Sequence, residues 1–186
     1  MSPKKEYKEW AMHLKNMVPG DLKVTSFSDD AEENTLDIFE SKNSEGILAS
    51  TIGVMEVGQG EGSKLFTEII MDARGENENI SNVLSTIGFY IVKDRWDVMP
   101  GVVFESMVEM YSPELEVKHV MFVAPFQWEE GMSNVALSTK TIYPLLAVPI
   151  TQGEYEFMIS NSAEALESLW ASKSTDVLNW GRASAA

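Results

Sequence analysis

Two histidines, His13 and His119, are the residues of this sequence best suited to general acid–base catalysis at neutral pH. His13 falls on the polar side of a short helical pattern, and His119 lies within a strand pattern. A catalytic serine on a Gly-x-Ser-x-Gly turn would need such a base, but that motif does not occur. The sequence also has no cysteine, which excludes disulfides and thiolate catalysis. We therefore interpret both histidines as structural and predict no catalytic residue.

Clustered carboxylates could bind a divalent cation. The segment SDDAEEN contains Asp29, Asp30, Glu32 and Glu33, but it lacks the glycine and the twelfth-position glutamate of a calcium loop. A solvated turn explains this composition better. We predict no bound metal.

A glycine-rich segment, GQGEGSK at residues 58–64, could be taken for a phosphate-binding loop. Its Glu61 would repel a phosphate, and the spacing fits neither the P-loop nor the dinucleotide-binding pattern. We interpret this segment as a flexible hairpin and predict no cofactor.

Two pairs of carboxylates, Glu129 with Glu130 and Glu154 with Glu156, could act as acid and base if burial raised one pKa. The sequence around them does not indicate burial. A small hydrolase or transferase that uses carboxylates therefore remains the alternative to a binding protein.

Trp128, in the segment PFQWEEGM, stands beside two of these carboxylates. Its side chain is either a lid packed on the sheet or a partly exposed anchor for a basic protein surface. For the second case we predict a partner-binding site made of Trp128, Glu129, Glu130 and Glu156.

The charge balance points to the same kind of partner. The chain carries 14 basic and 29 acidic residues, for a net charge of −15. A field of this sign repels nucleic acids and anionic membranes and attracts basic ligands. The longest apolar run, residues 143–150, is too short to span a bilayer, and the first residues do not resemble a signal peptide. We therefore expect a cytoplasmic protein, with a monomer favoured.

The elements that must position these residues alternate in blocks. Helical spacing predicts amphipathic helices at residues 5–16 and 79–96. Strand-forming composition predicts an antiparallel meander at 22–27, 35–40, 47–57 and 64–73, and two deep strands at 117–125 and 141–151. We predict an α+β fold, a single domain over residues 1–186 with a mostly antiparallel central sheet flanked by helices.

Two prolines interrupt the last strand, and a helix follows it. Proline donates no hydrogen bond to a sheet, so Pro144 and Pro149 suit strand ends or edge-facing positions. Thr151 and Glu154 fit a capping box. The spacing predicts one helix of about five turns from Thr151 to Trp170. Its core side would hold Tyr155, Met158, Ile159, Ala163, Leu166, Leu169 and Trp170. The small-residue tail RASAA is predicted to fray.

The segment from residue 120 to residue 182 carries a family resemblance. VMFVAP, an aromatic and acidic loop, LLAVPIT, the acidic helix EYEFMISNSAEALESLW and then DVLNWGR follow one another. This order resembles the suppressor of fused domain family, with Asp176 and Arg182 matching its late aspartate and arginine. The resemblance implies a non-enzymatic protein-binding domain. The chain's length is similar to that of the bacterial single-domain members, which are regarded as immunity proteins that neutralise polymorphic toxins.

We therefore expect a cytoplasmic immunity protein that neutralises a basic toxin domain by occluding it with an acidic surface. A few buried aromatic anchors would supply most of the affinity, and charge would speed association. Two alternatives remain open, the carboxylate enzyme named above and a regulatory adaptor protein.

Overall fold

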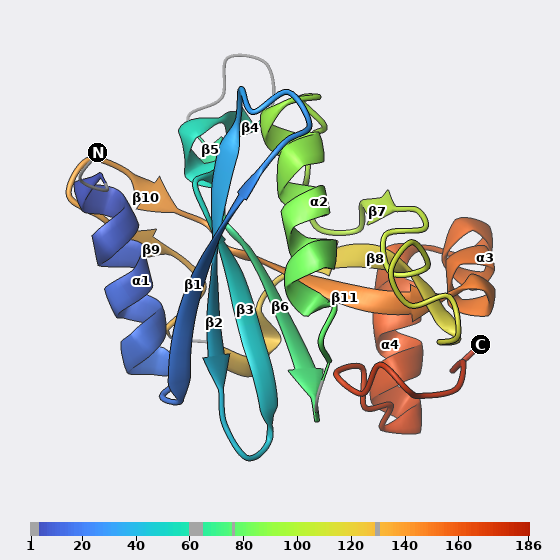
Figure 1. Ribbon diagram of the computed structural model, residues 1–186. Helices are drawn as coiled ribbons and strands as arrows, with labels where there is room; N and C mark the ends of the chain where they lie inside the picture. Colours follow the sequence, from blue (N-terminus) through green and yellow to red (C-terminus); the bar gives the residue numbers. More distant parts are fainter. Residues whose placement is uncertain (1–3, 60–64, 76, 129–130) are drawn as a thin grey trace.

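The computed structural model describes residues 4–59, 65–75, 77–128 and 131–186. Within these residues, seven strands form one sheet in the order β1-β2-β3-β6-β11-β8-β7, and four short strands form a second sheet in the order β4-β5-β10-β9. The larger sheet consists of β1 (Asp21–Ser28), β2 (Thr35–Lys42), β3 (Gly46–Ile52), β6 (Ile69–Arg74), β11 (Leu145–Thr151), β8 (Val117–Val123) and β7 (Val103–Phe104). The smaller sheet consists of β4 (Gly58–Gln59), β5 (Leu65–Phe66), β10 (Thr141–Ile142) and β9 (Val135–Ala136). The helices are α1 (Lys5–Met17), α2 (Ile80–Val92), α3 (Gln152–Ser160) and α4 (Ala163–Lys173), with 3-10 turns η1 (Val54–Glu56) and η2 (Phe126–Trp128) (Figure 1).

The predicted α+β class is confirmed. In the larger sheet β6 and β11 run parallel, and the other neighbouring strands pair antiparallel. The predicted meander is present as β1-β2-β3-β6, but the predicted strand 64–73 is divided. Its first part, β5, belongs to the smaller sheet, and the chain enters the larger sheet only at Ile69. The loop at the centre of the predicted hairpin, residues 60–64, lies outside the described residues, and the flanking β4 and β5 pair antiparallel.

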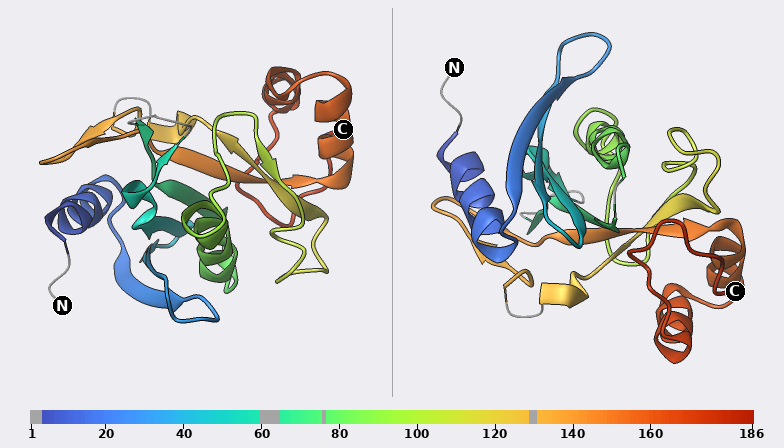
Figure 2. Two further views of the ribbon diagram at one scale, coloured as in Figure 1. Left: turned by 90° about the horizontal axis from the view of Figure 1, so that it is seen from above. Right: turned by 60° about the horizontal axis from the view of Figure 1, so that its bottom comes forward.

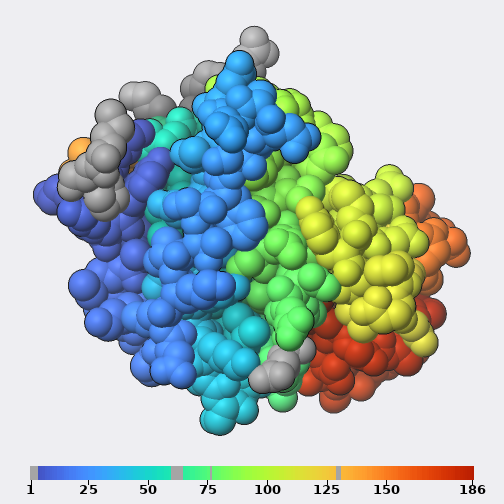
Figure 3. Space-filling view, viewed as in Figure 1, coloured from blue at the N-terminus to red at the C-terminus, as the bar shows by residue number. Residues whose placement is uncertain are grey.

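Alternating side chains divide the apolar interior into two cores. The first core lies between the sheet and α2, and it includes Ile47 and Met71. The second core lies on the opposite face, and it includes Leu48 and Ile70 from the same strands. Figure 2 shows α2 over one face, whereas α1 and α4 lie at opposite ends of the molecule. The second face of the sheet is therefore covered by helices at its two ends. On the surface, α2 lies between the β1–β2 strands and the segment that follows β7 (Figure 3).

Both predicted N-terminal helices are present. α1 buries Trp10 and Leu14 in the second core, as the helical spacing predicts. α2 ends at Val92 and not at residue 96, because the chain turns there: Arg95 has a φ of 61°, which a right-handed helix excludes. Gly88 allows α2 to approach the sheet closely, since a Cβ at this position would lie 2.2 Å from Leu36 Cδ2.

Pro144 precedes β11, and Pro149 lies inside it. Pro144 separates β10 from β11, so the predicted strand 141–151 is divided there. Pro149 lies inside β11 opposite Val120 of β8, and the strand continues to Thr151. The carbonyl of Pro149 accepts a hydrogen bond from Arg182 Nη2 at 3.1 Å and thus points away from β8. The missing N–H faces the same way, beyond the end of the β6 pairing at Leu146. The prediction that Pro149 ends the strand is therefore wrong, and the proline fits inside β11 because its nitrogen faces an unpaired edge.

The single five-turn helix predicted from Thr151 to Trp170 is wrong. The capping box of Thr151 and Glu154 is present, but α3 ends at Ser160 and α4 begins at Ala163. The side chains at the break compete for backbone groups: Asn161 Nδ2 donates to Phe157 O, and Ser162 Oγ caps α4 by accepting from Ala165 N at 3.1 Å. Because of this break, the side chains of α4 do not continue the helical spacing of α3.

The break between α3 and α4 alters which residues of this segment are buried. Ile159, predicted to be core, is 68% exposed. Leu166 and Trp170 are buried as predicted.

The C-terminal tail does not fray, which corrects the second expectation for this region. Arg182 and Ala185 are buried, and Ser184 Oγ lies 2.7 Å from Thr151 Oγ1. Lys173 Nζ donates to Ala185 O at 2.6 Å. The small-residue composition of the tail does not reveal these contacts.

Glu154 is fully buried and forms a bidentate ion pair with Arg182, at 2.6 Å to Nη1 and 2.7 Å to Nη2. Its carboxylate also accepts from Trp170 Nε1, Ala185 N and Thr151 N. Burial acts to raise the pKa of Glu154, but the hydrogen bonds and charge of Arg182, with the other donors, outweigh it and hold the pKa below its ordinary value. This carboxylate therefore joins β11, α3, α4 and the tail.

Candidate partner-binding site

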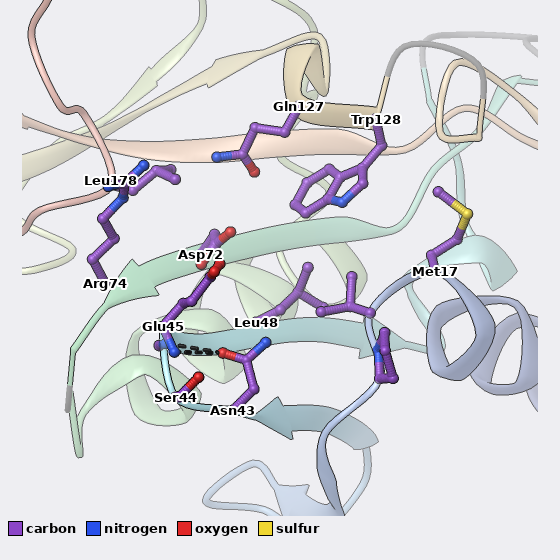
Figure 4. A pocket seen from close by; sticks show the side chains of 13 residues that line it. Met17, Asn43, Ser44, Glu45, Leu48, Asp72, Arg74, Gln127, Trp128 and Leu178 are labelled. Carbon is purple, nitrogen blue, oxygen red and sulfur yellow. Dashed lines mark hydrogen bonds between the residues drawn. The ribbon is translucent and has the colours of Figure 1, made fainter.

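A pocket of about 770 Å³ opens on the second face of the sheet, between the end of α1 and the segment that follows α4 (Figure 4). We call it the Trp128 pocket. It is lined by Met17, Val18, Pro19, Asn43, Ser44, Glu45, Gly46, Leu48, Asp72, Arg74, Gln127, Trp128 and Leu178. Gly46 and Leu48 come from β3 and Asp72 and Arg74 from β6, and the other residues come from loops, turns and the end of α1. The pocket thus occupies the part of this face between the two terminal helices.

Trp128 is held over this pocket by the turn η2. Its backbone carbonyl accepts from Gly131 N and Met132 N, both at 2.9 Å, and its side chain is half-buried against the second core. One side of the indole therefore packs on the protein, and the ring still lines the pocket (Figure 4). The indole is thus partly packed on the second core and partly open to the pocket, and both predictions for Trp128, a lid and an anchor, stay open.

Two carboxylates give the Trp128 pocket its charge. Asp72 is partly buried, and burial raises its pKa to about 6, against the lowering effect of the Arg74 charge. Arg74 itself lies 3.3 Å from Asp176 Oδ2, so its charge is shared with a second carboxylate. Glu45 is on the pocket wall beside Asn43, whose Oδ1 accepts from Glu45 N at 2.8 Å. A cation that entered the pocket would stabilise the charged form of Asp72.

Gln127, next to Trp128, adds an acceptor. Its Oε1 is buried and accepts no hydrogen bond from the residues that the structure describes. Its side chain extends into the pocket (Figure 4). Beside Arg74, which is paired with Asp176, the indole ring and the carboxylates of Asp72 and Glu45 suit a group that is cationic and rich in N–H donors, such as a lysine or arginine side chain.

The other residues predicted for the site have different positions. Glu129 and Glu130 lie outside the described residues. Glu156 is exposed on α3 and accepts from Gln152 Nε2 at 2.9 Å, and it does not line the Trp128 pocket. The predicted set is therefore not brought together in this pocket: Trp128 lines it and Glu156 does not. Asp72 and Gln127 were missed, although a lone acidic residue in the apolar run IIMDA was a signal for Asp72.

The two histidines have hydrogen-bonding roles in the fold. His13 Nε2 lies 2.9 Å from Gly131 O, and its ring stacks on Trp10. His119 is buried, and its Nδ1 accepts from Ser106 N at 2.9 Å. Its Nε2 must then carry the proton and donate to Gln152 Oε1 at 2.7 Å.

A second buried carboxylate, Glu68, also escaped the sequence patterns. It precedes β6 and accepts hydrogen bonds from Thr51 Oγ1, from Gly53 N at 2.8 Å and from Met55 N at 3.0 Å. Gly53 adopts a φ of 129° to direct its N–H at the carboxylate. Among the described residues no lysine or arginine pairs with Glu68, and burial raises its pKa to about 8.

The described residues contain no group of three or more histidine and acidic side chains that could hold a metal ion. They also contain no helix with the length and apolar character needed to cross a membrane.

Comparison with known proteins identifies the family. A family model described as suppressor of fused protein (SUFU) matches residues 32–183. The chain belongs to the suppressor of fused family. The match extends well beyond the segment 120–182 that carries the sequence resemblance, and it includes β2, β3 and β6 of the meander.

One relative and two solved structures resemble this chain over nearly its whole length. Immunity protein YqcF of Bacillus subtilis (strain 168) is 33% identical over 171 residues, which cover 89% of each protein. The structure of a putative SUFU homolog from Neisseria gonorrhoeae covers 98% of both chains with a TM-score of 0.77 and 17% identity. A chain from the Sufu–Fu complex has a TM-score of 0.71 and 12% identity, covering 99% of this chain and 93% of that one. The two structures support the fold alone.

Proposed function

We propose that this chain is an immunity-type protein that binds a basic toxin domain and neutralises it by covering it with an acidic surface. The observation that carries the proposal is the 33% identity to Immunity protein YqcF over 89% of both chains. The Sufu–Fu complex adds a suppressor of fused protein that assembles with another protein. Cytoplasmic residence, a monomeric state and the absence of catalysis are parts of the same proposal.

The Trp128 pocket supplies a mechanism for this binding. A net charge of −15 attracts a basic partner at long range. A lysine or arginine of the partner would then enter the pocket, stack on Trp128 and pair with Asp72. We propose Glu129, Glu130 and Glu156 as charges at the edge of the interface, which affect the rate of association more than the affinity.

Growth rescue tests the proposal. Toxin domains encoded beside the gene are induced in a host with and without this chain, and binding to each is measured by titration calorimetry. We expect one of them to be neutralised and to form a one-to-one complex with the chain. If the chain protects against none of these domains and binds none of them, the proposal is wrong.

The role of Trp128 is tested on the same complex. We expect Trp128→Ala to weaken binding by about 2 kcal/mol or more, mainly through faster dissociation. Tyr143→Ala is the control, because Tyr143 is an exposed aromatic residue that does not line the pocket. Equal affinity for the two variants would exclude Trp128 as an anchor.

The charges are tested by kinetics. Glu129→Lys combined with Glu130→Lys should slow association and weaken its salt dependence, because exposed charges are screened over about 8 Å at physiological ionic strength. Glu156→Lys tests α3 in the same way. An unchanged association rate in all of these variants would remove them from the interface.

A further inference from the structure

A second pocket, of about 290 Å³, lies on the other side of η2, against α4. We call it the α4 pocket. It is lined by Val123, Phe126, Glu167, Trp170, Ala171, Ser174, Thr175 and Val177. Val123, Trp170 and Val177 are buried and form an apolar floor, whereas Phe126 is 49% exposed at the rim. The volume is at the lower end of the range for small-molecule sites, about 300 to 1,000 Å³, so it suits one side chain.

The floor of the α4 pocket is rigid. Val123 is the last residue of β8, and the side chain of Trp170 on α4 is fixed by its hydrogen bond to the buried Glu154. Phe126 is presented by η2, a turn of three residues. A preformed apolar cavity with a half-exposed aromatic at its edge is typical of a site that receives an apolar anchor.

The rim of the α4 pocket is acidic. Glu167 lines it, and Glu164 lies one turn earlier on the same helix. Within the described part of the chain neither residue forms an ion pair. Burial and the neighbouring Glu164 charge raise the pKa of Glu167. A cation beside the pocket would relieve this repulsion.

The end of α4 adds to the negative potential. The last turn of the helix reaches the pocket at Ala171, and helix C-termini favour cations. The basic residue in this turn, Lys173, is directed elsewhere, because its Nζ donates to Ala185 O. The C-terminal end of α4 beside the pocket is therefore open to a cation of another molecule.

The α4 pocket adjoins the Trp128 pocket. Phe126 lines the first, and Gln127 and Trp128 line the second. The segment after α4 alternates in the same way, with Val177 in one and Leu178 in the other. A protein seated on η2 would therefore reach both pockets.

We propose that the α4 pocket is a second anchor site, which takes an apolar side chain of a protein partner with a lysine or arginine next to it. The identity of that partner as a toxin rests on the proposed function, but the chemistry of the pocket does not. The apolar side chain fills the floor beside Phe126, and the cation lies against Glu167 and the end of α4.

The first test needs no partner. The blocked dipeptide acetyl-Leu-Lys-amide is titrated into the ¹⁵N-labelled full chain, with acetyl-Leu-Glu-amide and acetyl-Gly-Lys-amide as comparisons. We expect saturable shifts at Phe126, Trp170 and Ala171 with Leu-Lys, and binding at least about threefold weaker with either comparison, because each lacks half of the recognition. Shifts that are absent, or equal for Leu-Lys and Leu-Glu, would overturn the proposal.

A pair of variants makes the result specific. Ala171→Trp places a bulky side chain in the pocket, and Ala171 is exposed, so the fold should tolerate it. Ser172→Trp adds the same bulk at the next helical position, which does not line the pocket. The shifts should disappear in Ala171→Trp and persist in Ser172→Trp. Shifts that survive in Ala171→Trp would place the dipeptide elsewhere.

The second test uses a toxin domain that the wild-type chain neutralises. Ala171→Trp should weaken the complex at least about tenfold and Ser172→Trp should not. If the wild-type chain neutralises the toxin and Ala171→Trp binds it equally well, the α4 pocket is not an anchor site. If no toxin is neutralised, the proposed function fails, and the dipeptide titration still decides the chemistry of the pocket.

Discussion

Glu154 and Glu68 are both excluded from solvent, but their surroundings act on them in opposite directions. Glu154, at the junction of β11 and α3, faces the guanidinium of Arg182 and has a lowered pKa. Glu68, between β5 and β6, is surrounded by N–H and O–H donors that include Thr51 Oγ1 and Gly53 N, and its pKa is raised. The neutral donors around Glu68 thus do not offset the effect of burial on its pKa, whereas the bidentate Arg182 keeps Glu154 charged.

The largest expected effect breaks the first of these arrangements. Arg182→Met leaves the Glu154 carboxylate buried without its cation, and we expect the free energy of unfolding at pH 7 to fall by about 3–5 kcal/mol. Urea denaturation measures it. The control is Arg74→Met, whose side chain is 63% exposed in its ion pair with Asp176, with an expected loss of about 0–1 kcal/mol. Similar losses in the two variants would mean that Arg182 stabilises only by packing.

The second prediction concerns the pH dependence that Glu68 imposes. Its pKa in the folded protein, about 8, lies above its ordinary value of 4.5, so the folded protein holds the proton more tightly. This contribution to stability is complete below pH 4.5 and is lost as the pH rises through 8. Glu68→Gln removes this loss, because an amide oxygen can still accept from Gly53 N and Met55 N.

This prediction is tested by measuring the free energy of unfolding of the wild type and the variants from pH 5 to pH 9. Relative to the wild type, Glu68→Gln should gain on the order of a few kcal/mol as the pH rises across this range. Glu154→Gln should show no trend over this range. Its lowered pKa contributes stability that is present above 4.5 and is lost only as the pH falls further, so the variant should be less stable than the wild type by a constant amount from pH 5 to pH 9. Parallel curves for Glu68→Gln and wild type would contradict the raised pKa.

The smallest expected effect removes one donor from each carboxylate. Trp170→Phe keeps the aromatic packing but removes the indole N–H that lies 3.0 Å from Glu154 Oε1, and it should cost about 1–3 kcal/mol. Because Glu154 stays charged, this cost should be constant from pH 6 to pH 9. Thr51→Val removes the hydroxyl donor of Glu68, and its cost should grow with pH as Glu68 ionises. A pH-dependent cost in Trp170→Phe would show that Glu154 also titrates in this range.

The sequence predicts local features of this molecule well. The capping box at Thr151 and the buried Trp10 both follow from residue types and short spacings, and the structure confirms them. The break between α3 and α4 was not anticipated, because Asn161 and Ser162 fit a helical pattern by spacing and interrupt it by hydrogen bonding. The extent of the domain, residues 1–186, stays a prediction.

The candidate site was harder to predict, for a different physical reason. Trp128 could be singled out because a tryptophan next to acidic residues is unusual. Asp72 and Gln127 come to the same pocket from a strand and a turn that are far apart in the sequence, and only the tertiary fold brings them together. The same holds for Arg182 and Glu154.

The parallel pairing of β6 with β11 has a consequence for how the chain folds. β1, β2, β3 and β6 pair with strands near them in the sequence, so they can assemble early, whereas Ile69 of β6 must wait for Leu145 of β11. Contacts of high sequence separation slow folding, because a long loop must close before they form. Until β11 arrives, the second edge of β6 is unprotected and open to pairing with another chain. During synthesis, the first half of this protein therefore exposes an unpaired edge of β6, which is covered only when β11 in the last third of the chain has been made.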